Sequence, residues 1–314
     1  MRALAVRAFR AAPELVEVPD PVVEPGRILV KVAAAGLNPV DWLIADGMLE
    51  GMAPHVFPLV LGRDFAGTVT EVGHGVTRFA VGDAVFGQAC GAAIGQGSYA
   101  QYVSASEDAP LALAPTSVPL VRAAALPTAG MTATQILEAL ALPQGASLLL
   151  VGAAGGVGSC LTQLAAARGV RVLAAVRGPE HARMAGLGAA VTLDTVARDL
   201  APAVRELHPD GVDALVDLAS GTRDGFAARA ALVRPGGTAL SSLHQEDPAR
   251  APRGVEVVGF EMSPRGDMLT DLARSVDGGR LRIVVEAEVP LEQGAAAVAR
   301  NRAGGARGRT VIVP

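Results

Sequence analysis

A strand, a glycine-rich turn and a helix follow one another between Ser147 and Arg168, and this stretch constrains the fold most strongly. The apolar run Ser147 to Val151 leads into AAGGVG at Ala153 to Gly158, and Cys160 to Arg168 then has the composition of a helix. The turn fits A-x-G-x-x-G, a variant of the dinucleotide-binding fingerprint. Its small residues permit a tight turn, close approach of a pyrophosphate and close helix–strand packing, and the helix N-terminus offers free N–H groups. A plain glycine loop remains the alternative in a chain with 37 glycines.

The chain beyond this turn alternates between apolar strand-like runs and helix-like segments, as a doubly wound parallel sheet requires. The run Val212 to Leu218 is almost wholly apolar, as expected for a strand covered on both faces. We therefore predict a Rossmann nucleotide-binding domain over residues 121–260, with the glycine turn after its first strand. The further predicted strands are Val170–Val176, Ala190–Leu193, Val212–Leu218, Thr238–Leu243 and Val255–Phe260, and the predicted helices are Ala182–Leu187, Val196–Leu207 and Phe226–Leu232.

The first 120 residues have a different pattern, with short alternating runs separated by glycine and proline turns. Such a pattern favours a β-barrel-like domain. The predicted strands are Met1–Val6, Glu14–Val18, Ile28–Ala34, Thr68–Val72, Ala84–Phe86 and Tyr99–Val103. After residue 260 we predict a helix at Met268–Val276, a strand at Leu281–Glu286, a helix at Pro290–Arg300 and a last strand at Thr310–Val313.

Composition excludes several classes of partner. The net charge is −4, charges of both signs are interspersed, and aromatic residues make up 3% of the chain, so neither a nucleic-acid surface nor a base-stacking platform is expected. No window resembles a membrane span or a signal peptide. The two cysteines, Cys90 and Cys160, form no disulfide framework or C-x-x-C site, so we expect a cytoplasmic protein.

Several motifs, taken in order, resemble the medium-chain dehydrogenase/reductase superfamily and most closely its quinone oxidoreductase branch. The resemblance implies a GroES-like catalytic domain over residues 1–120, completed by residues 261–314, and an α/β fold overall. It also implies a cofactor in the cleft between the domains and a homodimer formed through edge strands at Val255 to Phe260. The motifs are GLNPVDWLIADGM (Gly36–Met48), LVLGRDFAGTVTEVG (Leu59–Gly73), RFAVGDAVFG (Arg78–Gly87), GSYAQYV (Gly97–Val103) and the final ARGRTVIV.

The positions of zinc ligands in this superfamily carry other residues here. Zinc-dependent members have a Cys in a C-x-x-D stretch and a His in a G-H-E stretch, where this chain has Asn38 to Asp41 and Gly62-Arg63-Asp64. The third ligand would fall at about Thr128. None of the three replacements is a normal zinc ligand, so we expect no metal. Without a Lewis acid, alcohol oxidation is disfavoured and reduction of an already polarised acceptor is favoured.

Candidate reaction-site residues follow from the same stretch. Asn38 is interpreted either as a hydrogen-bonding residue near the nicotinamide or as a turn residue before Pro39. Asp41 is the second catalytic candidate, although holding the loop is favoured over moving a proton. Arg63 either contacts a ligand or forms a solvated salt bridge, and we favour the salt bridge. The resemblance implies a substrate pocket, more apolar than in relatives with tyrosines at two of its positions, formed by Trp42, Leu43, Leu49 and Phe57.

Cofactor choice is determined at the tip of the second Rossmann strand. An NAD enzyme usually has an acid there for the ribose 2′-hydroxyl, but this strand ends in Arg177, whose planar fork suits a 2′-phosphate. An exposed loop arginine is the alternative. We predict NADPH as the cofactor, with His181 near the position of a phosphate-binding lysine in relatives. The other contacts implied by the resemblance are Thr132 (or a helix back-bond from its hydroxyl), Ala154, Gly155, Gly156, Val157, Ser241, Leu243 and Phe260.

These observations together predict a zinc-independent, NADPH-dependent oxidoreductase. Its substrate would be a small quinone or α,β-unsaturated carbonyl, reduced by hydride transfer from the nicotinamide. Two alternatives remain at this point: an enoyl reductase acting on thioesters in polyketide-type biosynthesis, and a non-catalytic NADPH-binding redox sensor.

Overall fold

The computed structural model describes residues 1–91 and 93–314 and divides the chain into two compact units. The barrel unit comprises Met1–Met131 and Pro264–Pro314, and the Rossmann unit comprises Thr132–Ser263. The first boundary lies inside helix α3 (Pro127–Leu140), which begins after residue 121, the position where the sequence predicted the second domain to begin. Among the described residues, no helix has both the length and the apolar character needed to cross a bilayer.

The Rossmann unit is built on one six-stranded sheet in the order β12-β11-β10-β13-β14-β15, and every neighbouring pair is parallel. This strand order is that of a doubly wound dinucleotide-binding sheet, which confirms the predicted fold class. The strands are β10 (Ser147–Val151), β11 (Arg171–Val176), β12 (Val191–Asp194), β13 (Val212–Asp217), β14 (Val233–Ser241) and β15 (Glu256–Gly259).

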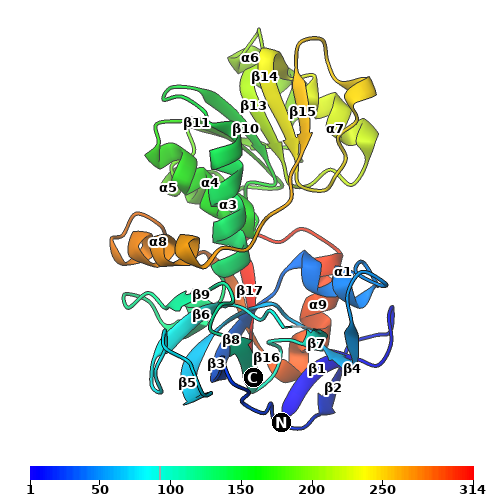
Figure 1. Ribbon diagram of the computed structural model, residues 1–314. Helices are drawn as coiled ribbons and strands as arrows, with labels where there is room; N and C mark the ends of the chain where they lie inside the picture. The colour runs from blue at the N-terminus through cyan, green and yellow to red at the C-terminus, as the bar shows by residue number, and fades with distance from the viewer. Residues whose placement is uncertain (92) are drawn as a thin grey trace. The chain divides into compact units, whose positions relative to one another are not determined.

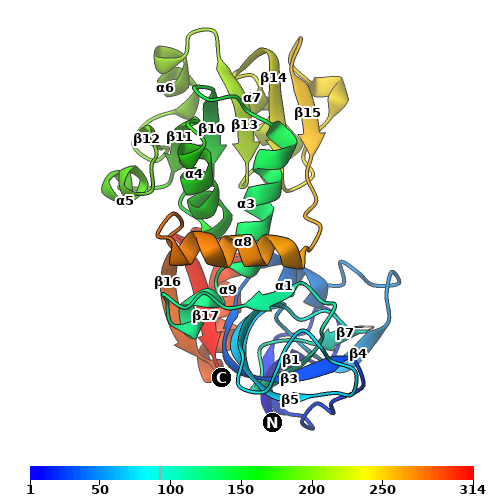
Figure 2. The ribbon, with the colours of Figure 1, turned by 60° about the vertical axis from the view of Figure 1, so that its left-hand side comes forward.

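Helices cover both faces of this sheet (Figure 1). Right-handed crossovers lead away from β10 in one direction and away from β13 in the other, so their helices pack on opposite faces. Figure 2 shows α4 in front of β10 and β11, with α7 behind β13 and β14. The core on the α7 side of the sheet contains Leu149, Leu173, Leu215 and Phe226, all at most 2% exposed. The helices are α4 (Gly156–Ala167), α5 (His181–Gly186), α6 (Leu200–Leu207), α7 (Arg223–Ala230) and the 3₁₀ turn η1 (Pro248–Arg250).

The barrel unit contains a seven-stranded sheet in the order β16-β17-β3-β5-β6-β9, with β8 also pairing β3, and a four-stranded sheet β2-β1-β4-β7. The last strand, β17, pairs antiparallel with β3, so the end of the chain joins a sheet formed by its first third. The strands are β1 (Arg2–Val6), β2 (Glu14–Glu17), β3 (Arg27–Gly36), β4 (His55–Val60), β5 (Asp64–Val72), β6 (Ala84–Gln88), β7 (Ile94–Gln96), β8 (Tyr102–Ser106), β9 (Leu111–Leu113), β16 (Val285–Pro290) and β17 (Arg309–Val313).

Short helices surround these sheets, and two apolar clusters form the cores. One cluster gathers Leu4, Leu37, Leu59 and Ile312 beneath α1 and α9, and the other lies among β3, β5, β6 and β8. The helices are α1 (Pro39–Ala45), α2 (Leu120–Ala123), α8 (Gly266–Asp277), the 3₁₀ turn η2 (Leu291–Gln293) and α9 (Gly294–Arg302).

Several predicted elements were wrong in extent, and for two of them the hydrogen bonds show how the chain differs from the prediction. The helix predicted from Val196 begins only at Leu200, because the Asp194 carboxylate accepts the N–H groups of Gly178 and Val196 at 2.9 Å and holds a turn there. The strand predicted at Leu281 begins only at Val285. The Leu281 N–H instead donates to the Ser275 carbonyl at 3.1 Å and continues the end of α8.

Candidate active site

The predicted glycine turn lies between β10 and α4, where each glycine has its own steric role. Gly152 has φ +83°, a left-handed conformation that favours glycine. A Cβ on Gly158 would lie 2.4 Å from the Gly152 carbonyl oxygen and 2.6 Å from the Ala153 Cα, so only glycine allows α4 to approach the turn this closely. Gly155 is the N-cap of the twelve-residue helix α4, and a Cβ there would meet only the Gly152 oxygen, at 3.4 Å.

This arrangement fits a dinucleotide pyrophosphate. Gly155, Gly156 and Val157 form the start of α4, where backbone N–H groups have no partner within the helix and the helix dipole favours an anion. Ala154 is 7% exposed, and its carbonyl accepts a hydrogen bond from Arg183 Nη2 at 3.1 Å. The turn therefore consists of small residues, and the hydrogen bond from Arg183 to the Ala154 carbonyl holds it in place.

The other predicted cofactor contacts of this unit lie at one edge of the sheet. Val151 pairs with Ala175 and Asp217 in register, and Ser241 pairs with Asp217 and Gly259. The segments that follow these strands therefore start side by side at the carboxyl edge, which is where open α/β sheets bind ligands. Thr132 is 8% exposed and lies on α3, which precedes the first strand of this sheet in the chain.

The loop after β14 is organised by Ser241. Its hydroxyl, on a side chain 1% exposed, accepts the N–H groups of Leu243 at 3.3 Å and Gln245 at 3.1 Å. Its carbonyl accepts the Phe260 N–H at 2.9 Å, which connects the two strand ends. Leu243 is 41% exposed, whereas Phe260 is partly buried.

Arg177 immediately follows β11 and is exposed, and His181 is the exposed first residue of α5. Hydrogen bonds from the Val196 and Gly178 N–H groups keep the pKa of the nearby Asp194 carboxyl below its usual value. That carboxylate accepts hydrogen bonds from the backbone. The exposed side chain that directly follows β11 is the cationic Arg177.

Two arginines organise this edge through hydrogen bonds that were not predicted from the sequence, although Arg183 was considered as a phosphate-binding candidate. Arg183 Nε donates to Glu180 at 2.6 Å while its Nη2 binds the glycine turn. Arg229 Nη1 donates to both carboxylate oxygens of Asp217 at 3.0 Å. Asp217 is 1% exposed and ends the central strand, so an acid closing the apolar run VDALVD was the signal in the sequence.

In the barrel unit, Asn38 and Asp41 contact each other at the start of α1. The Asn38 N–H donates to Asp41 Oδ2 at 2.7 Å, and the Asn38 side-chain amide donates to the Gly36 carbonyl at 3.3 Å. Because Asn38 is the N-cap and Pro39 the first residue of the helix, its role as a turn residue is visible directly.

Asp41 has a second partner that the sequence did not reveal. The Tyr99 hydroxyl donates to Asp41 Oδ2 at 2.6 Å, and both side chains are at most 2% exposed. Asp41 Oδ1 is buried and has no hydrogen-bond partner among the described residues. Burial raises the pKa of Asp41 to about 7, because the two hydrogen bonds compensate only partly for lost hydration. The same burial, together with the neighbouring Asp41 carboxyl, raises the pKa of the Tyr99 hydroxyl.

The positions that hold zinc in other superfamily members form a different polar network. Asp64, fully buried, accepts hydrogen bonds from the Thr128 hydroxyl at 2.5 Å, the Thr128 N–H at 3.0 Å and Gln88 Nε2 at 3.3 Å. It also forms a buried ion pair with Arg309 at 3.1 Å. An arginine, a threonine and an asparagine do not offer a zinc ligand set, so these residues do not fit that metal.

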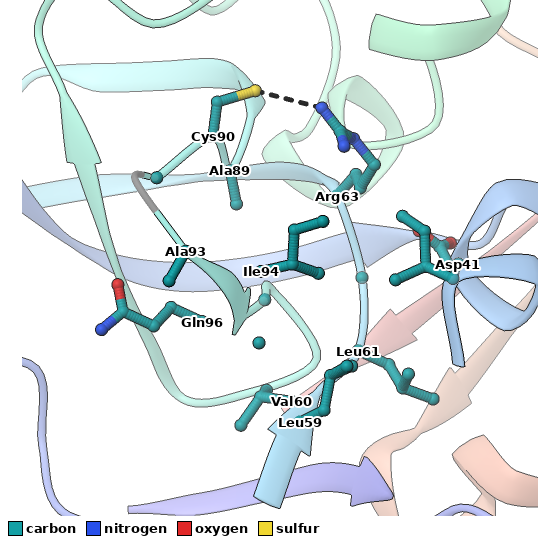
Figure 3. A pocket seen from close by; sticks show the side chains of 15 residues that line it. Asp41, Leu59, Val60, Leu61, Arg63, Ala89, Cys90, Ala93, Ile94 and Gln96 are labelled. Carbon is teal, nitrogen blue, oxygen red and sulfur yellow. Dashed lines mark hydrogen bonds between the residues drawn. The ribbon is translucent and has the colours of Figure 1, made fainter. Parts of the chain in front are cut away.

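One cavity of about 110 Å³ lies within the barrel unit (Figure 3). Its walls are apolar side chains such as Leu59, Leu61 and Ile94, together with several glycines, and Asp41 contributes to the lining. Arg63 Nη2 donates to Cys90 Sγ at 3.2 Å, and Figure 3 shows the two groups facing each other. The solvated salt bridge favoured for Arg63 was wrong: the residue is partly buried, and none of the described carboxylates pairs with it.

The four residues predicted to form a substrate pocket lie outside the lining of this cavity. Trp42 Nε1 donates to Asn301 Oδ1 at 3.0 Å, and the Arg302 guanidinium lies 5.0 Å from the centre of its ring. Phe57 is 39% exposed and packs edge-on against Phe9. Leu43 and Leu49 are partly buried, and Leu49 packs on the core beneath α1. Their role toward substrate stays a prediction.

Comparison with known proteins gives the family. The Alcohol dehydrogenase GroES-like domain family matches residues 24–116, and the Zinc-binding dehydrogenase family matches residues 187–312. The chain is 30% identical to the chloroplast envelope quinone oxidoreductase homolog of Arabidopsis thaliana, over 96% of this chain and 94% of the relative. This chain belongs to the quinone oxidoreductase branch of the medium-chain dehydrogenase/reductase superfamily.

Further similarities within the branch extend over the whole chain. The NADPH-dependent alkenal/one oxidoreductase of Arabidopsis thaliana chloroplasts is 30% identical over 94% of this chain and 74% of its own length. The quinone oxidoreductase of Coxiella burnetii superposes with a TM-score of 0.87 at 28% identity, covering 100% of this chain and 99% of that structure. The relatives are named oxidoreductases and the superfamily uses NAD(P). The prediction that the chain is an oxidoreductase is therefore confirmed. The second family is named for zinc binding. In this chain, however, the zinc-ligand positions of the superfamily hold Asn38, Arg63 and Thr128, which are not normal zinc ligands.

Proposed function

We propose that this chain is a zinc-independent NADPH-dependent reductase of small quinones or α,β-unsaturated carbonyls. The observation that carries the proposal is the glycine turn of a complete doubly wound sheet, in a chain whose zinc positions hold no zinc ligands. The names of the relatives, a quinone oxidoreductase homolog and an alkenal/one oxidoreductase, support the same chemistry.

The residues of this chain would bind and orient the reactants. When bound, NADPH supplies a hydride that adds to a quinone or to the β-carbon of an enone, and a proton completes the reduction. Gly155 to Val157 would hold the pyrophosphate, and the loop from Ser241 to Leu243, with Phe260, would lie along the cofactor. Asn38 would donate a hydrogen bond near the reacting atoms. Asp41 would act as a positioning residue for Asn38, through the hydrogen bond that it accepts from the Asn38 N–H.

The preference for NADPH would rest on Arg177, with His181 beside it. An exposed guanidinium at the tip of β11 can hold a 2′-phosphate bidentately, whereas a ribose 2′-hydroxyl gives it no charged partner. For the wild type we expect kcat/KM with NADPH to exceed that with NADH by roughly 10- to 100-fold, as for one charge-assisted pair. Arg177→Ala should lose most of this ratio by weakening NADPH and leaving NADH unchanged.

The test measures NADPH and NADH oxidation with 1,4-benzoquinone, a neutral enone and a crotonyl thioester. Arg171→Ala, an exposed arginine at the opposite end of β11, controls for the loss of a surface charge. Equal use of both cofactors by the wild type would overturn the NADPH assignment. Turnover of the thioester alone would replace the proposed substrate class by an enoyl-thioester.

A homodimer is also proposed, through β15. This strand is the last of the six in the sheet, so one side of its backbone pairs with no other described strand. Pairing of two copies of Glu256–Gly259 would extend the sheet across both Rossmann units. Light scattering after size-exclusion chromatography measures this directly, with Val257→Pro as a variant that blocks the pairing. A wild-type monomer at micromolar concentration would refute the proposal.

A further inference from the structure

Arg63 lines the cavity of the barrel unit and forms an ion pair with none of the described residues. Guanidinium groups remain protonated at all physiological pH values, so Arg63 contributes a full positive charge. In the part of the chain that the structure describes, its side chain donates a hydrogen bond only to the Cys90 sulfur, at 3.2 Å. Burial raises the pKa of the Cys90 thiol even though Arg63 opposes the change, so the thiol is neutral near pH 7 and leaves the charge of Arg63 uncompensated.

The neighbouring carboxylates are engaged elsewhere. Asp64 follows Arg63 directly, but its carboxylate is bound to Arg309, Thr128 and Gln88. Asp41 also lines the cavity, and its raised pKa of about 7 keeps a large part of it neutral at physiological pH. No carboxylate among the described residues therefore neutralises the guanidinium. A partly buried cation without a partner is costly, and a ligand anion would remove that cost.

The size and walls of the cavity limit what the ligand can be. Pockets that enclose a whole drug-sized ligand measure about 300–1,000 Å³, so a cavity of about 110 Å³ holds only one end of such a molecule or a small one. The walls beside Arg63 are aliphatic, from residues such as Ile44, Leu59 and Ile94. A single guanidinium fork matches the two oxygens of a carboxylate. A short carbon chain that ends in a carboxylate combines both features.

We propose that Arg63 and the cavity around it form a carboxylate-binding subsite, and that the preferred acceptors are short enones or quinones that carry a carboxylate. This inference rests on the proposed reductase function and specifies its substrate class. The guanidinium would bind the carboxylate bidentately, displacing or sharing its contact with Cys90, and the aliphatic walls would cover the adjoining carbons.

The experiment compares (E)-4-oxopent-2-enoate with its methyl ester, which has the same enone and no charge. With NADPH saturating, we expect wild-type kcat/KM to favour the carboxylate by roughly 10- to 100-fold, the range for a hydrogen bond to a charged group. Arg63→Met should lose this advantage, so that its kcat/KM for the carboxylate falls to about its kcat/KM for the ester. Arg63→Lys retains the charge without the fork and should give an intermediate ratio. Arg7→Met, at a residue 72% exposed in the same unit, is the matched control and should keep the wild-type ratio.

Binding without turnover gives a second readout. The saturated acid 4-oxopentanoate should inhibit wild-type reduction of 1,4-benzoquinone competitively, at concentrations at least tenfold below those required for Arg63→Met. A wild type that reduces the ester as well as the carboxylate, or an Arg63→Met variant that loses both equally, overturns the subsite while the reductase function stands. If no quinone or enone is reduced at all, the reductase function fails. Calorimetric binding of 4-oxopentanoate to the wild type and Arg63→Met then decides the subsite separately: equal binding, or none, refutes it.

Discussion

Asp41→Asn should stabilise the barrel unit at high pH and have little effect at low pH. Asparagine has nearly the shape of a protonated aspartic acid, and its side-chain oxygen can accept the Asn38 N–H and the Tyr99 O–H in the same places. It carries no charge that burial could penalise. The variant therefore replaces a group whose charged form is disfavoured in the folded state by one that has no charged form.

The sign and size follow from the pKa of Asp41. Burial raises this pKa from 3.8 to about 7, so between these pH values the folded state binds more protons than the unfolded chain. The wild-type free energy of unfolding must then fall as pH rises from about 4 to about 7, and stay level above that. At about 1.4 kcal/mol per pH unit, the total loss is on the order of 4 kcal/mol. The same amount should separate Asp41→Asn from the wild type at pH 8, whereas at pH 4 the two should be nearly equal.

Urea unfolding between pH 4 and pH 8.5 measures this difference. The single tryptophan of the chain, Trp42, is the next residue after Asp41 on α1, so its fluorescence reports on the unfolding of the barrel unit. Asp108→Asn removes an exposed carboxyl from the same unit and should stay within about 0.5 kcal/mol of the wild type throughout. A gap between Asp41→Asn and the wild type that is constant with pH, or that closes as pH rises, would refute the reasoning.

Further substitutions test the glycine turn and the buried network around Asp64. Gly158→Ala should lower the free energy of unfolding by about 1–3 kcal/mol or more, because its Cβ would lie 2.4 Å from the Gly152 oxygen. Gly155→Ala should unfold like the wild type. It should nevertheless bind NADPH more weakly in a fluorescence titration. Arg309→Met should lower the free energy of unfolding in urea by about 3–5 kcal/mol, because it leaves Asp64 without its ion pair. Asp64→Asn in that background should recover part of the loss. If the effects of the two substitutions on the free energy of unfolding simply add, the coupling is contradicted.

The Rossmann unit was predictable because its signals are local. The first four strands, β10 to β13, are largely apolar runs of four to six residues, and each is followed by a helix. The glycine turn adds steric requirements that few other structures share. The errors in this unit are also local: the carboxylate of Asp194 binds two backbone N–H groups and delays the start of α6. A side chain that competes for backbone hydrogen bonds leaves no trace in hydrophobic periodicity.

The candidate site of the barrel unit was only partly predictable because its partners are distant in sequence. Asp41 was identified from its motif, but Tyr99 lies 58 residues further along the chain, and the raised pKa depends on their joint burial. Cys90 lies 27 residues from Arg63, and the pair becomes meaningful only when a cavity is known beside it. Pairings of this kind are determined by strand register, which a single sequence does not display.

The two charged residues of Gly62-Arg63-Asp64 replace a zinc-ligand motif and have different partners in the structure. Where zinc-dependent relatives have a histidine ligand, this chain has a cation and an anion on adjacent residues, and the two do not pair with each other. Asp64 is neutralised within the fold by Arg309, at the far end of the chain, and this buried ion pair joins β5 to β17. The charge of Arg63 is consequently left for a ligand. A positive charge at an acceptor site can polarise a carbonyl or hold a carboxylate, but it cannot bind an alkoxide as zinc does, so the exchange favours reduction of quinones and carboxylate-bearing enones over oxidation of alcohols.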